Sequence, residues 1–113
     1  MTVTIIGTIK NSGEEGLDGY IRVTANVNFV DSDGEFHIAQ IPYRDAITDG
    51  EFEIEIPETS KIVTGVEQVK VVGNKTLKYK FEFLDSNSNV YRVLDNIQID
   101  YSASPIDIAD LVV

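Results

Sequence analysis

The chain of 113 residues has no cysteine and a single histidine, His37. It cannot form a disulfide, and it lacks the second histidine or the thiol that a nucleophile pair or a transition-metal site usually needs. If a strand runs through Phe36 and Ile38, alternation directs those two side chains to the core and the His37 ring to the surface. We therefore expect no enzyme activity and no cofactor.

Basic residues are also few, with 9 Lys and Arg against 19 Asp and Glu, and the formal net charge is −10. A surface this acidic repels phosphate backbones and anionic lipids, so we expect neither nucleic acid nor a membrane as partner. No apolar run approaches the roughly 18 residues of a membrane-spanning helix, and no secretory leader is visible. The acidity serves solubility alone, or it marks a face that meets a basic partner or binds divalent cations.

What the chain does contain is alternation of apolar and polar residues with a period of two, which is typical of half-buried β-strands. The clearest examples are Ile21 to Phe29, Phe52 to Ile56 and Tyr79 to Phe83, with turn-forming residues between them. Residues 58–76 are the least regular, although Val66 to Val72 indicates one strand. About seven short strands predict an all-β protein, an antiparallel β-sandwich that forms one domain over residues 1–113.

The turn Asp31-Ser32-Asp33-Gly34 is similar to the start of a calcium-binding loop. A full loop also needs a bidentate acid about six residues after the glycine, and Gln40 stands in that neighbourhood instead. The pattern favours a hairpin turn, in which Asp-Gly supplies the backbone conformation that a tight turn needs. Asp31 and Asp33 are therefore only weak metal-binding candidates, and no other metal site is expected.

The last ten residues predict a short helical turn that ends on apolar residues. Ser104 suits the N-cap, Pro105 the first helical position, and Asp107 the residue that answers the cap. Exposed apolar patches usually mark interfaces. We expect contacts with other subunits through Ile6, on the outward face of the first strand, and through the cluster Ile106, Ile108, Leu111, Val112 and Val113.

Three segments, taken together, resemble a known class of module. Ile6-Gly7-Thr8-Ile9 with residues 17–23, and Thr48 to Pro57, are similar to small transthyretin-like or carboxypeptidase-regulatory-like β-sandwich modules. Residues 91–93, 97–99, 102–105 and 108–112 look like the end of such domains in tailed-phage tail-fibre and minor tail proteins. The resemblance implies a phage virion structural protein (a fibre-attachment, adaptor or decoration module of tail, neck or baseplate). It also implies other virion proteins as partners, and a homo-oligomer such as a trimer or ring.

Two alternatives stay open. One is a module that binds carbohydrate or a host surface through the turns at 11–19, 31–34 and 85–89, and Tyr20, Tyr43 and Tyr91 could then form an aromatic platform. The other is an accessory domain of a bacterial extracellular protein. The hydrolases of the transthyretin-related type have a multi-histidine site and a C-terminal Tyr-Arg-Gly-Ser motif, and this chain shows neither.

Overall fold

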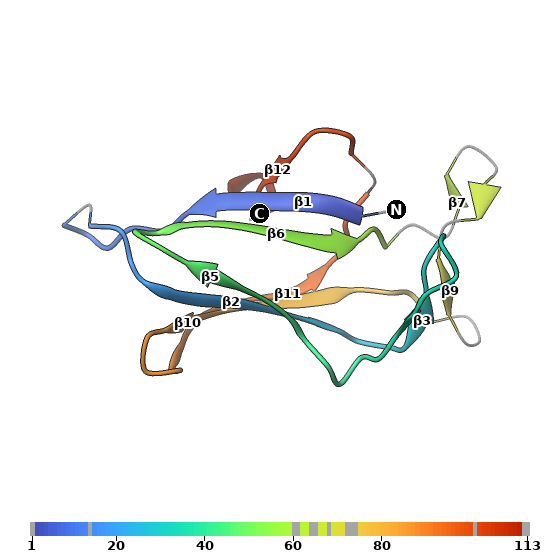
Figure 1. Ribbon diagram of the computed structural model, residues 1–113, viewed down its shortest axis with the longest axis horizontal. Coiled ribbons are helices and arrows are strands. Elements are labelled where there is room, and N and C mark those ends of the chain that lie inside the picture. The colour runs from blue at the N-terminus through green and yellow to red at the C-terminus, as the bar shows by residue number, and fades with distance from the viewer. Residues whose placement is uncertain are drawn as a thin grey trace.

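The fold is given by a computed structural model that describes residues 2–13, 15–59, 62–63, 66–67, 69–71, 75–100 and 102–111. It is an all-β protein with 54% of its residues in strands, arranged as an elongated sandwich of 47 × 27 × 23 Å (Figure 1). The helical content is one short 3-10 turn near the C-terminus. The predicted fold class is therefore confirmed.

The first sheet of the sandwich has three strands in the order β12-β1-β6. β1 (Thr2–Thr8) pairs antiparallel with β6 (Glu51–Pro57) and parallel with the short β12 (Ile106–Asp107). Alternation sets the two faces of β6, as the sequence predicted. Its apolar side chains are buried while Glu51, Glu53 and Glu55 are exposed.

The second sheet has four antiparallel strands in the order β11-β10-β2-β5. They are β2 (Gly19–Ala25), β5 (Tyr43–Ile47), β10 (Tyr79–Asp85) and β11 (Val90–Ile97). The inner sides of both sheets form one core, to which each buried aliphatic side chain contributes about 1.5–3 kcal/mol. Its least exposed members include Val3, Ile5, Ile21, Val23, Ile56, Leu77, Tyr79, Phe81 and Ile99.

A hairpin turn carries the chain from β5 in the second sheet to β6 in the first. The φ angle is +50° at Asp49 and +81° at Gly50, and a two-residue hairpin turn of this kind needs positive φ at both central positions. A Cβ atom at Gly50 would also collide with the backbone oxygen of Ile9. The predicted Asp-Gly turn is thus present, and it is packed against the end of β1.

A small end sheet closes one end of the sandwich (Figure 1). Its strand order is β4-β3-β9, and all pairs are antiparallel. The short hairpin of β7 and β8 lies at the same end. The bounds are Phe29–Val30 for β3, Phe36–His37 for β4, Ile62–Val63 for β7, Val66–Glu67 for β8 and Lys70–Val71 for β9.

These short strands correct two expectations. The strand predicted from Ile21 to Phe29 is broken, because the Asn26 side chain bonds the neighbouring backbone. It accepts the Lys78 amide at 2.8 Å and donates to the Thr76 carbonyl at 2.9 Å. The one strand predicted at Val66 to Val72 is at least two short strands, β8 and β9, and Val72 itself lies outside the described residues.

The C-terminal turn also begins later than predicted. Ile106 and Asp107 extend along β1 as β12, so the 3-10 helix η1 covers Ile108–Leu111. Its start is capped by Asp107, whose Oδ1 accepts the Ala109 amide at 2.9 Å. Ser104 is therefore not the N-cap, because pairing with β1 holds the next residues in a strand.

Candidate functional site

The most organised polar cluster in the described residues lies in the turn between β3 and β4. Asp31 is its centre, with a side chain that is almost entirely buried. The Asp31 Oδ1 atom accepts the amide of Asp33 at 2.9 Å and the amide of Glu35 at 3.0 Å. This side-chain turn is the reason why a short Asp-rich segment can reverse direction here. It also leaves Asp31 Oδ2 directed at His37.

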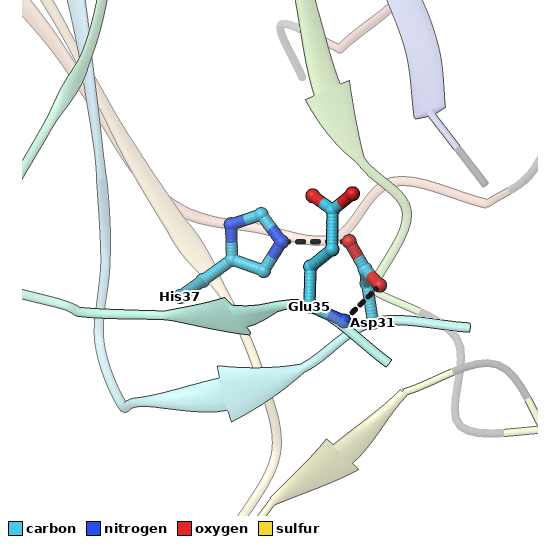
Figure 2. Close-up of side chains that lie close together, drawn as sticks. All are labelled: Asp31, Glu35 and His37. Atoms are coloured by element: carbon cyan, nitrogen blue, oxygen red, sulfur yellow. Dashed lines mark hydrogen bonds and ion pairs between the residues drawn. The ribbon is translucent and has the colours of Figure 1, made fainter. Parts of the chain in front are cut away.

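His37 points into the molecule, contrary to our expectation of a surface ring. Its Nε2 lies 2.7 Å from Asp31 Oδ2, and its Nδ1 lies 2.7 Å from the Tyr43 hydroxyl (Figure 2 shows the contact with Asp31). The ring stacks on Phe29 with a centroid distance of 4.6 Å. The register of the hairpin causes the inversion, because it pairs His37 with buried Phe29 and leaves Phe36 64% exposed.

The polar chain continues from Tyr43 toward the core. Burial, together with the charge of Asp31, raises the pKa of Tyr43 to about 12, and burial also raises the pKa of Tyr79. The Tyr79 hydroxyl donates to the Pro57 carbonyl at 2.8 Å, at the end of β6. At neutral pH Tyr43 therefore keeps its proton, and with a neutral His37 it donates to Nδ1 while Nε2–H donates to Asp31.

Two opposing effects act on the Asp31 carboxyl group. Burial raises its pKa, but the hydrogen bonds from His37 and from the amides of Glu35 and Asp33 outweigh burial. The net pKa is lowered from the ordinary value of 3.8. Asp31 is thus a carboxylate at neutral pH, fixed by three donors. The acid–histidine–hydroxyl order is that of a proton relay, but a phenol that keeps its proton to about pH 12 is a donor rather than a nucleophile.

Within the described part of the chain, Asp31, Glu35 and His37 form a group that could hold a metal ion. Each offers one ligand atom, and these atoms lie within 4.8 Å of one another (Figure 2). The Glu35 side chain is exposed, so it can close over the other two. Asp33, the second weak candidate from the sequence, lies outside this group. Its side chain is exposed, and only its backbone amide contacts Asp31.

The residues predicted to contact other subunits do not form one patch. Ile106 and Leu111 pack against the core of the same chain, and Ile108 belongs to that core with 8% exposure. Ile108 therefore has little surface to offer a partner. Ile6 is half-buried on the opposite face, beside Glu53 and Asp107. Val112 and Val113 lie outside the described residues, and a contact role for the remaining positions stays a prediction.

The three tyrosines proposed as a platform are also separate. Tyr20 lies under the Arg44 guanidinium, 4.8 Å from the ring centroid, and its hydroxyl contacts Ser88 at 3.2 Å. Tyr43 takes part in the chain to Asp31. Tyr91 lies on β11 and is 41% exposed.

The positions of the large exposed apolar side chains were not predicted from the sequence. In the described residues, the large ones form two groups. One group lies in the segment after Asp31, and the other lies on β11, which is an outer strand of the second sheet. The exposed side chains are Phe36, Ile38, Ile41, Val90, Tyr91 and Val93. The available signal was the run at residues 90–94, where apolar side chains occur on both faces instead of one.

A second buried carboxyl group lies directly after β6. Glu58 is fully buried, and within the described part of the chain neither of its oxygens has a hydrogen-bond partner. Burial raises its pKa above the ordinary 4.5, the positive charge of the N-terminus opposes the increase, and the nearby charge of Asp100 adds to it. The adjacent Thr59 is well bonded, since its Oγ1 accepts the Ile99 amide at 2.9 Å.

Comparisons with profiles of known protein families, with curated proteins and with solved structures found no match. Among the described residues, no helix has the length and apolar character needed to span a membrane.

Proposed function

We propose that the chain is an assembly module of a tailed-phage virion, and that its subunits join through the outer edge of β11. The observation that supports assembly through β11 is that, within the part of the chain that the structure describes, one side of this strand is unpaired. β11 runs from Val90 to Ile97, and in the described residues only one of its sides is paired, with β10. The virion part rests on the resemblance of the closing segments, which include residues 91–93 of this same strand.

An outer strand of this length presents a row of backbone donors and acceptors to solvent. Natural outer strands are usually kept short or protected by charge or by bulges, because they otherwise pair with other chains. β11 has bulges between Val90 and Arg92 and between Leu94 and Ile97, so pairing along its whole length requires these bulges to straighten. On β11, Val90, Tyr91 and Val93 are 42%, 41% and 46% exposed. Pairing with another strand would bury these side chains and satisfy the open backbone groups. Both terms favour association.

The strand also complements itself in charge. If two copies of β11 pair antiparallel about an axis between Val93 and Leu94, and the bulge between Leu94 and Ile97 straightens, Arg92 of each copy lies opposite Asp95 of the partner subunit. Opposite charges that face each other across paired strands stabilise the pair, and like charges destabilise it. The partner that fits this edge best is therefore a second copy of the chain, which gives a closed two-fold dimer. Larger virion assemblies would then be built from such dimers.

The test is the solution mass, measured by light scattering over a range of concentrations. We expect a species of twice the 12.5 kDa chain mass for the wild type and a monomer for Val93→Lys. Ile41→Lys is the matched control, because Ile41 is 66% exposed but lies in the segment between β4 and β5. Arg92→Asp should weaken the dimer, and adding Asp95→Arg should restore it.

Three results would refute parts of the proposal. A monomeric wild type at millimolar concentration would exclude assembly through β11 by itself. Equal effects of Val93→Lys and Ile41→Lys would exclude this edge. The virion role has its own check, which is mass spectrometry of purified phage particles. Absence of the chain from particles, with the dimer intact, would leave an assembly module of a different kind.

A further inference from the structure

We propose that Asp31, Glu35 and His37 form a binding site for a divalent first-row transition-metal ion, with Zn²⁺ as the probe. The site lies in the turn between β3 and β4, at the end of the sandwich (Figures 1 and 2). Neither β11 nor the proposed dimer contributes to it, so the two proposals can fail separately.

The distances are close to those of a metal centre. Zn²⁺ binds histidine nitrogen and carboxylate oxygen at about 2.0–2.2 Å, so tetrahedral ligand atoms lie about 3.3–3.5 Å apart. The His37 Nε2 and Asp31 Oδ2 atoms are 2.7 Å apart, and the ligand atoms of the three residues all lie within 4.8 Å of one another. Binding needs a small opening of the His37–Asp31 pair and a small inward movement of exposed Glu35. In the tautomer that is protonated on Nε2, a proton lies between these two atoms, and the ion would displace it.

A second observation is independent of the carboxylates. A metal-binding histidine normally has its other ring nitrogen held by an outer partner, which fixes the orientation of the ring. Here the Tyr43 hydroxyl lies 2.7 Å from Nδ1, and Phe29 stacks on the ring. With a metal on Nε2, the Nδ1 proton is donated to the Tyr43 oxygen. The ring is therefore held by partners on two other strands, Phe29 on β3 and Tyr43 on β5, in the orientation that directs Nε2 at Asp31.

The orientation of the Asp31 carboxylate is also fixed by hydrogen bonds. The amides of Asp33 and Glu35 occupy its Oδ1 atom, which leaves Oδ2 as the ligand atom. Asp31 and Glu35 together supply two negative charges to offset the two positive charges of the ion.

The donor set also selects the class of metal. Calcium takes six to eight oxygen ligands, more than this turn offers, whereas an imidazole nitrogen favours Zn²⁺ and its first-row neighbours. Three protein ligands leave a fourth tetrahedral position for water or for a ligand from a partner.

The experiment is calorimetric titration of the full chain, purified without a polyhistidine tag, with ZnCl₂. We expect one Zn²⁺ per chain and no comparable binding of Ca²⁺. Glu35→Gln should weaken Zn²⁺ binding by at least about tenfold, and His37→Gln should abolish it. Asp33→Asn is the matched control, because it removes an exposed acid from the same turn. It should keep the affinity within about twofold.

Because His37 is part of the packing, His37→Gln could lose its fold, and the comparison of Glu35→Gln with Asp33→Asn then decides. Both positions are exposed. Equal Zn²⁺ affinities in these two variants would overturn the proposal, as would the absence of Zn²⁺ binding by the wild type. Co²⁺ provides a second readout. Its visible absorption bands should show tetrahedral coordination in the wild type and should change in Glu35→Gln.

Discussion

Two carboxyl groups are buried among the described residues, those of Asp31 and Glu58, and their surroundings shift their pKa values in opposite directions. Asp31 receives hydrogen bonds from His37 and from two backbone amides, and its pKa is lowered. Glu58 has no hydrogen-bond partner within the described residues, and its pKa is raised. Tyr79 connects the two regions, because it donates to the Pro57 carbonyl next to Glu58 and packs edge-on against Tyr43.

The difference shows what burial means for a charged group. A buried carboxylate is unfavourable unless hydrogen bonds or an opposite charge replace the lost water. At Asp31 the turn supplies that replacement, so the carboxylate holds the structure together. At Glu58 the described residues supply none, so the group is favoured in its protonated form. Stability should therefore depend on Asp31 and should improve when the charge of Glu58 is removed.

The largest effect in this comparison is expected for Asp31→Ala. It removes the partner of His37 and of two amides, and a buried polar group left without a partner costs about 1–3 kcal/mol. We expect the free energy of unfolding to fall by about 2–3 kcal/mol at pH 7, measured by urea denaturation. Asp33→Ala is the control and should change it by less than about 0.5 kcal/mol. Equal losses in the two variants would show that the Asp31 hydrogen bonds contribute little.

A smaller effect of opposite sign is expected for Glu58→Gln. Glutamine keeps the shape of the side chain and removes the buried charge, so we expect a gain of about 1–2 kcal/mol at pH 7. The same urea experiment measures it. Glu55→Gln, on exposed β6 surface, is the control and should be close to neutral. A loss of stability in Glu58→Gln would mean that the carboxylate has a stabilising partner after all.

The smallest effect is a difference in the pH dependence of stability. The pKa of Asp31 is lowered, so its contribution is present above 3.8 and is lost as the pH falls through the folded-state pKa. The pKa of Glu58 is raised, so its contribution is present below 4.5 and is lost as the pH rises through the folded-state pKa. The melting temperature, measured between pH 2 and 8, should fall at low pH because of Asp31 and at higher pH because of Glu58. Glu58→Gln should reduce only the fall at higher pH, and a change confined to low pH would contradict this assignment.

Much of the sandwich could be predicted from the sequence, because its strands bury one face and expose the other. Phe52, Ile54 and Ile56 are buried between exposed glutamates, and Phe81 and Phe83 are buried on β10 as predicted. A one-residue change of register would move every such side chain to the wrong face. Long alternating strands therefore specify their own orientation.

The end sheet could not be predicted in this way. β3 and β4 have two residues each, so alternation carries little information, and the five-residue turn between them sets the register. From hydrophobicity alone we predicted a buried Phe36 and an exposed His37. The side-chain turn at Asp31 sets a register in which His37 points inward and Phe36 is exposed. Asp31 was recognised as a turn residue and as a weak ligand. Its two partners in the proposed metal site depend on that register.

The two neighbours of β1 are far from it along the chain. Ile5 pairs with Ile54 on one side and with Ile106 on the other. Contacts this distant in sequence must form by closing large loops, and proteins rich in them typically fold over about milliseconds to seconds. During synthesis, β1 can pair with β6 once residue 57 has been made, but its other edge stays open until residues 106 and 107 follow. In that interval the open edge of β1 is available for incorrect pairing with another strand.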